Sequence, residues 1–443
     1  MRFTSITCEQ REEMLEVVGV EGVEALFADV PDGALLNRPL DIAPGLSEIE
    51  LSRHIRDLAD ANVPASALVS FAGAGCYDHY IPSVVDHVLR RPEFFTAYTP
   101  YQPEVSQGTL QAIYEYQTMV CELTGMEVAN ASMYDGATAF VEGALMACRL
   151  TKRGRVLVSA AVNPEWIETL LTYCESGLME VDVVDAAADV TDRETLAAVL
   201  DETIAAVLVS SPAFLGGIED VGGLARAAHD AGALLVVATN PILLGVMEPP
   251  GALGADIVVG EGQPLGNAMS YGGPGLGLFA CRAAHVRQMP GRLVGRTVDA
   301  DGNSAFVLTL STREQHIRRE KATSNICSNH ALNALAAGVY LASVGPEGLR
   351  DIATACVSKA HYLRDRLIAT GRFTAPWEAP FGYEFALRYE GDASEMYDRM
   401  LERGFLAGVV LESEDDGDLV LFAVTEKRTR AEIDAFVEEV ASL

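Results

Sequence analysis

The sequence is poor in lysine, has no paired cysteines and lacks any long apolar segment. Of its 443 residues only four are lysine, so arginine carries most of the positive charge. The eight cysteines are dispersed and form no C-x-x-C pair, which argues against a zinc site and a disulfide framework. No apolar run approaches the ~20 residues of a membrane span, and the first residues are polar and acidic rather than signal-like. We expect a cytoplasmic protein with reduced cysteines, no membrane association and no bound metal.

The charge balance is strongly acidic. The chain has 32 basic and 63 acidic residues, a net charge of −31. This excess disfavours nucleic acid or an anionic membrane as the main partner. With 49% hydrophobic and 21% charged residues, the composition is that of a folded globular protein. A chain of this length suits two or three domains.

Three regions follow one another along the chain. Residues 11–61 have the apolar spacing of helices. A central region alternates short apolar runs with helical segments, which predicts a mostly parallel α/β sheet with helices on both faces. After Gly302 a basic stretch leads into helical text from 330 to 369 and then into short strands and a terminal helix. We predict an N-terminal helical arm at 1–65, a large α/β domain at 66–325 and a small C-terminal α/β domain at 326–443.

Two predicted loops, at 71–82 and 95–109, have the highest density of polar and aromatic residues in the chain. Their glycines and prolines make regular structure improbable, and their side chains offer several hydrogen-bonding groups: Tyr77, His79, Tyr80, Tyr98, Tyr101 and Gln102. Either these residues build a site, or the aromatic rings pack the arm onto the domain. Gly73-Ala-Gly75 lacks the third glycine and the preceding apolar strand of a dinucleotide-binding fingerprint, so it is weak evidence for a bound NAD. Ser106 is placed to cap the helix that Gly125 ends.

Two further segments have more than one interpretation. Residues 134–139 open a helix with small side chains, which suits an anion at the helix N-terminus. Asp135 would repel a phosphate there, so a simple N-cap remains equally open. The basic stretch from 313 to 321 suits a carboxylate, a phosphate or a partner's acidic surface. The alternative is that its cations pair with carboxylates of the same chain.

Four sequence blocks resemble the glycine-cleavage-system P-protein family, and within it subunit 1 (alpha) of the two-subunit form. They are FAGAGCYDHYIP at 71–82, FTAYTPYQPEVSQGTLQ at 95–111, ASMYDGATA at 131–139 and REKATSNICSN at 319–329. The resemblance implies a fold like that of the type I pyridoxal-phosphate-dependent transferases. In that fold a large domain surrounds a mostly parallel seven-stranded sheet, and a smaller domain follows at the C-terminus.

A self-sufficient enzyme of that type needs a lysine for the Schiff base and an acidic partner for the pyridinium nitrogen. In the family the lysine lies between a strand and a glycine-rich stretch, which corresponds here to residues 258–275. That region contains no lysine, and Gln263 stands near the vacant position. The acidic residue would fall near Ala238 and Thr239. We therefore expect that this chain does not hold the cofactor covalently.

The resemblance implies that a second chain, subunit 2 (beta), supplies the lysine and most cofactor contacts in an α2β2 assembly. The implied reaction is decarboxylation of glycine and transfer of the aminomethyl group to the lipoylated H-protein. By this resemblance His79 and Tyr98 act in a shared catalytic site, and eight other residues lie near substrate or cofactor: Tyr77, Tyr80, Tyr101, Gln102, Glu104, Ser106, Gln107 and Lys321.

Two alternatives remain. One is a non-catalytic scaffold subunit, although a scaffold has no need for so many polar groups on tight loops. The other is a self-sufficient pyridoxal-phosphate enzyme, against which the missing lysine argues.

Overall fold

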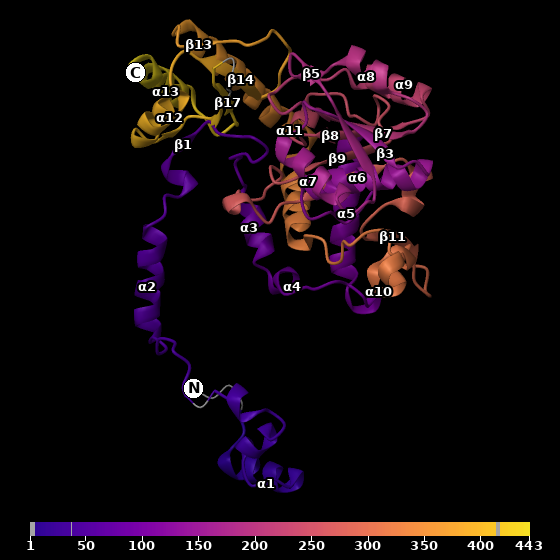
Figure 1. Ribbon diagram of the computed structural model, residues 1–443, viewed down its shortest axis with the longest axis vertical. Coiled ribbons are helices and arrows are strands. Elements are labelled where there is room, and N and C mark those ends of the chain that lie inside the picture. Colours follow the sequence, from indigo (N-terminus) through magenta and orange to yellow (C-terminus); the bar gives the residue numbers. More distant parts are fainter. Residues whose placement is uncertain (1–4, 37, 413–416) are drawn as a thin grey trace. The chain divides into compact units, whose positions relative to one another are not determined.

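The computed structural model describes residues 5–36, 38–412 and 417–443. The chain divides into two compact units, residues 1–63 and 64–443, which are described separately (Figure 1). Among the described residues, no helix is long and apolar enough to cross a membrane.

The first unit contains two helices, α1 (Cys8–Val18) and α2 (Glu48–Asp60). Both begin with a capping box, in which the N-cap side chain and the third helical residue bond each other's backbone N–H group: Thr7 with Gln10, and Ser47 with Glu50. Short 3₁₀ turns lie between them at η1 (Val23–Phe27) and η2 (Asp32–Ala34). No described residue of α1 or α2 is buried, so local caps define where these helices begin.

The second unit is built on a mixed sheet. Within its described residues this sheet has seven strands, in the order β2, β10, β9, β8, β7, β3, β4. Strands β4, β3, β7, β8 and β9 are parallel, whereas β10 is antiparallel to both β9 and β2. The predicted mostly parallel seven-stranded α/β sheet is confirmed. The bounds are β2 (Val128–Ala129), β3 (Arg155–Ser159), β4 (Glu180–Val184), β7 (Ile204–Ser211), β8 (Leu234–Thr239), β9 (Ile257–Glu261) and β10 (Gly277–Cys281).

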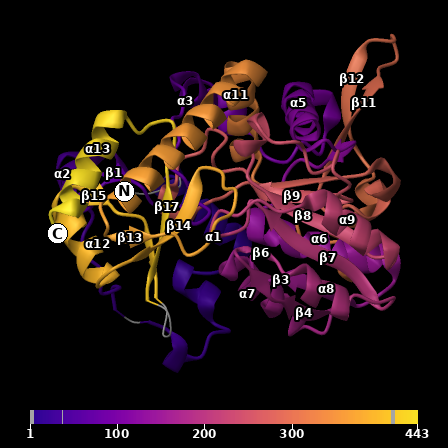
Figure 2. The same ribbon diagram turned by 90° about the horizontal axis from the view of Figure 1, so that it is seen from above.

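Helices cover both faces of this sheet, which explains why its strands are apolar without interruption. Successive side chains of a strand point to opposite faces. Leu235 accordingly lies in the core beneath α5 (Gln107–Thr124), α9 (Val221–Asp230) and α11 (Ala331–Ala369). Its neighbour Val236 lies in the core beneath α6 (Gly136–Thr151) and α7 (Pro164–Cys174). Figure 2 shows α5 and α11 on one side of the strands and α7 on the other.

The helices of the second unit are α3 (Ser83–Leu89), α4 (Pro92–Phe95), α5 (Gln107–Thr124), α6 (Gly136–Thr151), α7 (Pro164–Cys174), α8 (Arg193–Val199), α9 (Val221–Asp230), α10 (Gln315–Arg318), α11 (Ala331–Ala369), α12 (Ala393–Glu402) and α13 (Arg430–Ala441). Its 3₁₀ turns are η3 (Ala65–Ala67), η4 (Pro103–Val105), η5 (Leu243–Gly245), η6 (Ser270–Gly272), η7 (Ala283–Gln288), η8 (Ser311–Arg313) and η9 (Arg319–Lys321).

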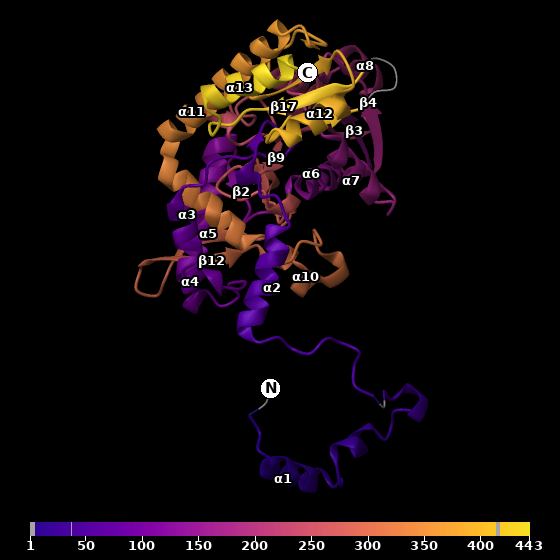
Figure 3. The ribbon, with the colours of Figure 1, turned by 90° about the vertical axis from the view of Figure 1, so that its left-hand side faces the viewer.

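The C-terminal region forms a second sheet in the order β13, β14, β17, β16. Its strands are β13 (Phe373–Thr374), β14 (Glu384–Tyr389), β16 (Val409–Leu411) and β17 (Leu419–Ala423). The long α11 contacts both α5 and α13. It kinks at Gly345, which has a φ of 62° and is followed by Pro346 (Figure 3). One apolar cluster joins Leu235 of the central sheet to Phe422 of β17. The division into a large and a small domain at 325 and 326 stays a prediction.

Three small pairings complete the fold. Strand β1 (Val69–Ser70) pairs with β15 (Phe405–Leu406), and β5 (Ala186–Ala187) pairs with β6 (Val190–Thr191). Strands β11 (Leu293–Val298) and β12 (Ser304–Thr309) form an antiparallel hairpin that projects from the rest of the unit in Figure 2.

We expect Leu235→Ala to destabilise the second unit by about 3 kcal/mol, because the substitution removes a buried side chain and leaves a cavity in the core. Leu235 has no exposed surface. The measurement is the urea midpoint of the full chain followed by circular dichroism. Val298→Ala, at an exposed position of the hairpin, is the control and should shift the midpoint little. Equal midpoints for the two variants would contradict the described core.

Candidate functional site

The first candidate site is a cavity at the carboxyl ends of the parallel strands β7 and β8. The chain passes from β3 outward to β4 and returns to β7 on the other side of β3, so the strand order reverses here. Open α/β sheets bind their ligands at such a reversal. The cavity measures about 70 Å³, and its wall includes Trp166, Ser210, Thr239, Glu261, Tyr383 and Glu384. We call it the strand-end cavity.

Glu261, the last residue of β9, places its carboxylate at the N-terminus of α6. It accepts hydrogen bonds from the backbone N–H groups of Gly136 at 2.9 Å, Gln263 at 2.8 Å and Leu276 at 2.8 Å. Asp135 caps the same helix by accepting from the Thr138 N–H at 2.8 Å. The N-cap interpretation of Asp135 is therefore confirmed. Two carboxylates of the chain itself occupy the helix end that attracts anions.

Gln263, near the position where a Schiff-base lysine would stand, is buried and fully engaged. Its amide oxygen accepts from the Tyr77 N–H at 3.0 Å, and its amide nitrogen donates to the carbonyl oxygens of Tyr77 at 3.1 Å and Asn267 at 2.8 Å. This side chain joins the turn after β9 to the loop at 71–82.

Glu384 is a buried carboxylate that has no cationic partner in the part of the chain that the structure describes. It accepts from the Tyr77 hydroxyl and from the Ala74 N–H, each at 2.6 Å. Burial raises the pKa of Glu384 to about 7, because these neutral donors offset only part of the lost solvation. Burial likewise raises the pKa of Glu261, against the effect of its three N–H donors.

Pyridoxal phosphate does not fit the strand-end cavity of this chain. Gln263 offers an amide where the Schiff base needs a lysine, and that amide is tied to Tyr77. Strand β8 ends at Ala238 and Thr239, which provide no carboxylate for the pyridinium nitrogen. Glu261 fills the helix end that would take the phosphate. The cofactor has no covalent or ionic anchor here.

A second cavity, of about 220 Å³, lies against α5 and the start of α11. Its wall is mainly apolar and includes Phe95, Tyr98, Thr99, Ile113, Arg292 and Leu332. We call it the aromatic cavity. Tyr98, a wall residue, is 75% exposed, so this cavity has an accessible aromatic rim. Tyr101, close by in the chain, is 48% exposed.

Arg292 is the buried cation of the aromatic cavity. Only 4% of the residue is exposed, and its guanidinium pairs with Glu314 at 3.1 Å. It also donates to the hydroxyl oxygens of Thr99 at 3.0 Å and Tyr101 at 3.2 Å. A guanidinium has five N–H donors in a fixed plane. These three contacts hold the loop at 95–109 in one orientation and leave two N–H groups unassigned.

Glu314 links Arg292 to a histidine at the rim. One of its oxygens, Oε1, is buried and has no hydrogen-bond partner among the described residues. The other lies 3.6 Å from Nδ1 of His316, whose ring meets the Tyr101 ring edge-on at 5.6 Å. His316, Tyr101 and Arg292 thus form one connected polar group.

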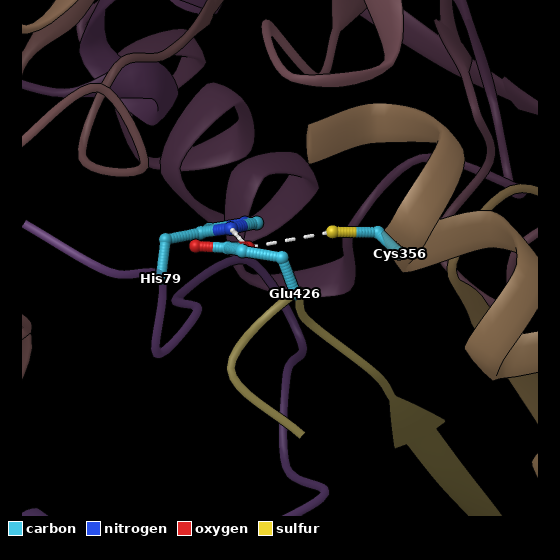
Figure 4. Close-up of side chains that lie close together, drawn as sticks. All are labelled: His79, Cys356 and Glu426. Carbon is cyan, nitrogen blue, oxygen red and sulfur yellow. Dashed lines mark hydrogen bonds and ion pairs between the residues drawn. The ribbon is translucent and has the colours of Figure 1, made fainter. Parts of the chain in front are cut away.

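His79 lies elsewhere, in a buried cluster with Glu426 and Cys356 (Figure 4). Its Nδ1 donates to a Glu426 oxygen at 2.6 Å, and its Nε2 lies 3.4 Å from the Tyr383 hydroxyl. Burial alone would raise the pKa of Glu426, but the hydrogen bond and charge of His79 lower it to about 2. Both ring nitrogens of His79 are therefore engaged inside the chain.

Ligand atoms of His79, Glu426 and Cys356 lie within 4.8 Å of one another, and histidine, carboxylate and thiolate groups all bind zinc. The 2.6 Å separation of Nδ1 and the carboxylate oxygen is that of a charge-assisted hydrogen bond. It leaves no room for a metal ion between the two atoms. The Lys359 ammonium, which donates to the Glu426 carbonyl at 2.6 Å, adds a positive charge beside them.

The remaining predicted site residues are dispersed. Tyr80 is exposed and donates only its backbone N–H to Glu426, whereas Lys321 lies in η9. Gln102 and Glu104 lie at the start of η4. Gln107 anchors the hairpin through both backbone groups of Phe306. Tyr98 and Tyr101 are brought together with Arg292, but His79 does not line the aromatic cavity.

The expectation that Ser106 caps α5 with its side chain is wrong. Ser106 occupies the N-cap position, yet its side chain makes no capping hydrogen bond. Its φ of −121° and ψ of 21° differ from the extended geometry of a typical N-cap. The first turn instead uses Gln107, whose side chain donates to the Pro103 carbonyl at 2.7 Å. Gly125 ends α5 in the left-handed conformation, as predicted.

The basic segment at 313–321 binds mainly main-chain carbonyls rather than carboxylates. Arg313 donates to the carbonyls of Leu310 and Gly291, and Arg318 donates to that of Thr312. These contacts tie the segment to the residues just before it and to the turn that precedes β11. The expectation of pairing with the chain's own carboxylates does not describe these two arginines.

Several residues of both cavities carried no signal in the sequence. Arg292, Glu261, Glu384 and Glu426 lie in ordinary text, and their partners are remote in the chain. Arg292 follows Pro290-Gly291, which indicates only a turn.

We predict that Glu384→Gln stabilises the chain increasingly as the pH rises. The folded-state pKa of about 7 exceeds the ordinary value of 4.5, so the folded chain binds more protons between these values. The contribution of Glu384 to the unfolding free energy therefore falls as the pH rises from 4.5 to 7, by ~3 kcal/mol at most. A glutamine does not titrate, so the variant avoids this loss. Urea midpoints of both proteins from pH 5 to 8 test this. A constant difference between the two curves would contradict it.

The family model for the glycine cleavage system P-protein matches residues 1–440. Among curated relatives, the probable glycine dehydrogenase (decarboxylating) subunit 1 of Carboxydothermus hydrogenoformans is 50% identical over 440 residues, 99% of each chain. The protein of the same name from Geobacillus kaustophilus is 49% identical over 441 residues, covering 99% of this chain and 98% of its own.

Solved structures give the same assignment. A crystal structure of glycine decarboxylase (P-protein) of the glycine cleavage system, in inhibitor-bound form, matches with a TM-score of 0.92 and 45% identity over 100% of both chains. The glutamate decarboxylase of Lactobacillus brevis matches with a TM-score of 0.68 at 14% identity, over 94% of this chain and 96% of its own. The latter likeness concerns the fold, which is that of the type I pyridoxal-phosphate-dependent enzymes. The chain belongs to the glycine cleavage system P-protein family.

Proposed function

We propose that this chain is the first subunit of glycine dehydrogenase (decarboxylating) and that it completes a cofactor site held by a second subunit. The full-length relatives carry that name, and the subunit number in it implies a second chain. The observation that carries the proposal is Glu261 at the N-terminus of α6, with Gln263 tied to Tyr77. These contacts occupy the position where the cofactor would bind in this chain, which supports the proposal that the second subunit holds it. When bound, pyridoxal phosphate withdraws electrons from an attached amino acid and supports the loss of carbon dioxide.

The aromatic cavity supports a role in the shared site. Tyr98 lines this cavity and is 75% exposed, and Arg292 fixes Thr99 and the Tyr101 hydroxyl close to it in the chain. Side chains held in this way keep their orientation when a partner approaches, which reduces the entropy lost on binding. Arg292 is itself paired with Glu314, so its role at this face is to position Thr99 and Tyr101 rather than to supply an unpaired charge. We propose that this face contacts substrate or cofactor on subunit 2.

His79 supports a positioning role. It is 6% exposed, and its ring nitrogens face Glu426 and Tyr383. In this arrangement it fixes the loop at 71–82 and keeps Tyr80 at the surface. Direct proton transfer would require the Glu426 contact to open.

The remaining parts of the proposal follow the resemblance. We propose an α2β2 assembly, glycine as substrate and transfer of the aminomethyl group to the lipoyl arm of the H-protein. The proposed location is the cytoplasm, on the basis of the dispersed cysteines and the acidic charge.

Tyr98→Phe removes the rim hydroxyl and keeps the ring. In the complex with subunit 2 we expect roughly a tenfold or larger fall in the rate of glycine decarboxylation, because a positioned acid–base or hydrogen-bonding group contributes that much. Carbon dioxide release is measured beside assembly by sedimentation. Tyr173→Phe, on α7 and away from both cavities' described polar groups, is the matched control.

His79→Ala tests the positioning role in the same complex. We expect a lower melting temperature together with a lower rate, because the buried Glu426 loses a hydrogen-bond partner. Unchanged rates for both Tyr98→Phe and His79→Ala, with assembly intact, would favour the scaffold alternative.

The isolated chain should form no stoichiometric Schiff base with pyridoxal phosphate. Its four lysines all lie away from the turn after β9. After incubation with pyridoxal phosphate and reduction by borohydride, peptide mapping should find only scattered weak labelling. Full labelling of one lysine of this chain would establish a self-sufficient cofactor site and refute the proposal.

A further inference from the structure

The strand-end cavity has no role in the proposed function, yet it keeps the features of a ligand site. It lies where the strand order reverses between β3 and β7, the usual ligand position of an open α/β sheet. A single water needs roughly 10–15 Å³ of such space. The cavity's volume of about 70 Å³ therefore admits several non-hydrogen atoms.

The charge of its wall determines what can enter. Glu261 and Glu384 both line the cavity, and among its described lining residues there is no lysine, arginine or histidine. An anion would meet two carboxylates without a compensating charge, so phosphates and carboxylic acids are excluded. A small cation would supply the positive charge that would balance the two carboxylates.

The hydrogen-bonding capacity of these carboxylates is only partly used. Each carboxylate oxygen has two acceptor positions. Oε1 of Glu384 accepts from Ala74, Oε2 accepts from Tyr77, and Oε2 of Glu261 accepts from Gly136. With one donor each among the described residues, these three oxygens each keep one acceptor position. A primary ammonium group has three donors, which matches that number.

Aromatic rings form part of the same wall. Trp166, Phe214 and Tyr383 line the cavity beside the carboxylates. The face of an aromatic ring attracts a cation through its quadrupole, more strongly where water is excluded. An organic ammonium ion would be attracted by both the carboxylates and the ring faces, whereas a neutral molecule would not.

We infer that the strand-end cavity binds a small primary ammonium ion of about the size of methylammonium, through the carboxylates of Glu261 and Glu384. Glycine itself is excluded, because its carboxylate would face these two groups. The inference does not rest on the proposed function, and it assigns this cavity a ligand different from that of the shared site.

Trp166 provides the measurement. The chain has two tryptophans, so Trp377→Phe leaves Trp166, in the cavity wall, as the single fluorophore. The full chain carrying this change is titrated with methylammonium chloride, with potassium chloride at equal ionic strength and with glycine. We expect a saturable change of Trp166 emission and a rise in melting temperature with methylammonium alone.

Glu384→Gln should weaken methylammonium binding at least tenfold, since a charge-assisted hydrogen bond is lost. Glu219→Gln is the matched control, because Glu219 is also buried but does not line the cavity, and it should keep the parent affinity. Ala238→Leu, which fills the cavity without changing charge, should also abolish the response. The inference is refuted if potassium or glycine gives the same response as methylammonium, if methylammonium gives none, or if Glu384→Gln binds as tightly as the parent.

Discussion

The Glu261 carboxylate at the N-terminus of α6 is the contact on which the surrounding loops depend. Three backbone N–H groups converge on it, from the first turn of α6, from the turn after β9 and from the start of the segment leading to β10. Such a group of donors offsets the loss of solvation of a buried charge, and the helix dipole adds to it. Through Gln263 the same turn also holds the backbone of Tyr77. An anion from solution would have to displace a side chain that is covalently part of the sheet.

Cations are scarce in this chain, and the structure concentrates the buried ones away from the strand-end cavity. A net charge of −31 leaves about one basic residue for every two acidic ones. Arg292 lines the aromatic cavity and pairs with Glu314, whereas Glu261 and Glu384 have only neutral donors among the described residues. The two cavities therefore differ in electrostatic character. A paired guanidinium lines the aromatic cavity, and two carboxylates with neutral donors line the strand-end cavity.

The sequence predicted the elements that depend on local pattern. Strands β3, β7 and β8 are apolar runs, so they were predictable from the sequence. The long α11 was predictable from its helical spacing, which continues on both sides of Gly345 and Pro346. Strand β2 has two residues, too few to show a period. The partners of the site residues were not predictable, because Tyr77 meets Glu384 and His79 meets Glu426 across more than 300 residues. Ser106 was wrongly expected to cap α5, since its residue type fits a cap while its backbone geometry does not.

The polar residues of the loop at 71–82 have structural partners within the chain. Tyr77 is needed to satisfy Glu384, His79 to satisfy Glu426, and Asp78 pairs with Lys427 at 2.5 Å. The loop thus ties the central sheet to the C-terminal region, and a scaffold would need these contacts as much as an enzyme would. The number of polar groups on this loop therefore does not distinguish the two. Tyr98 is the residue that can separate them by experiment, because it is 75% exposed and lines the aromatic cavity. The proposed role of this side chain lies in what approaches the cavity from outside, so a change confined to its hydroxyl tests that role without disturbing the contacts of the 71–82 loop.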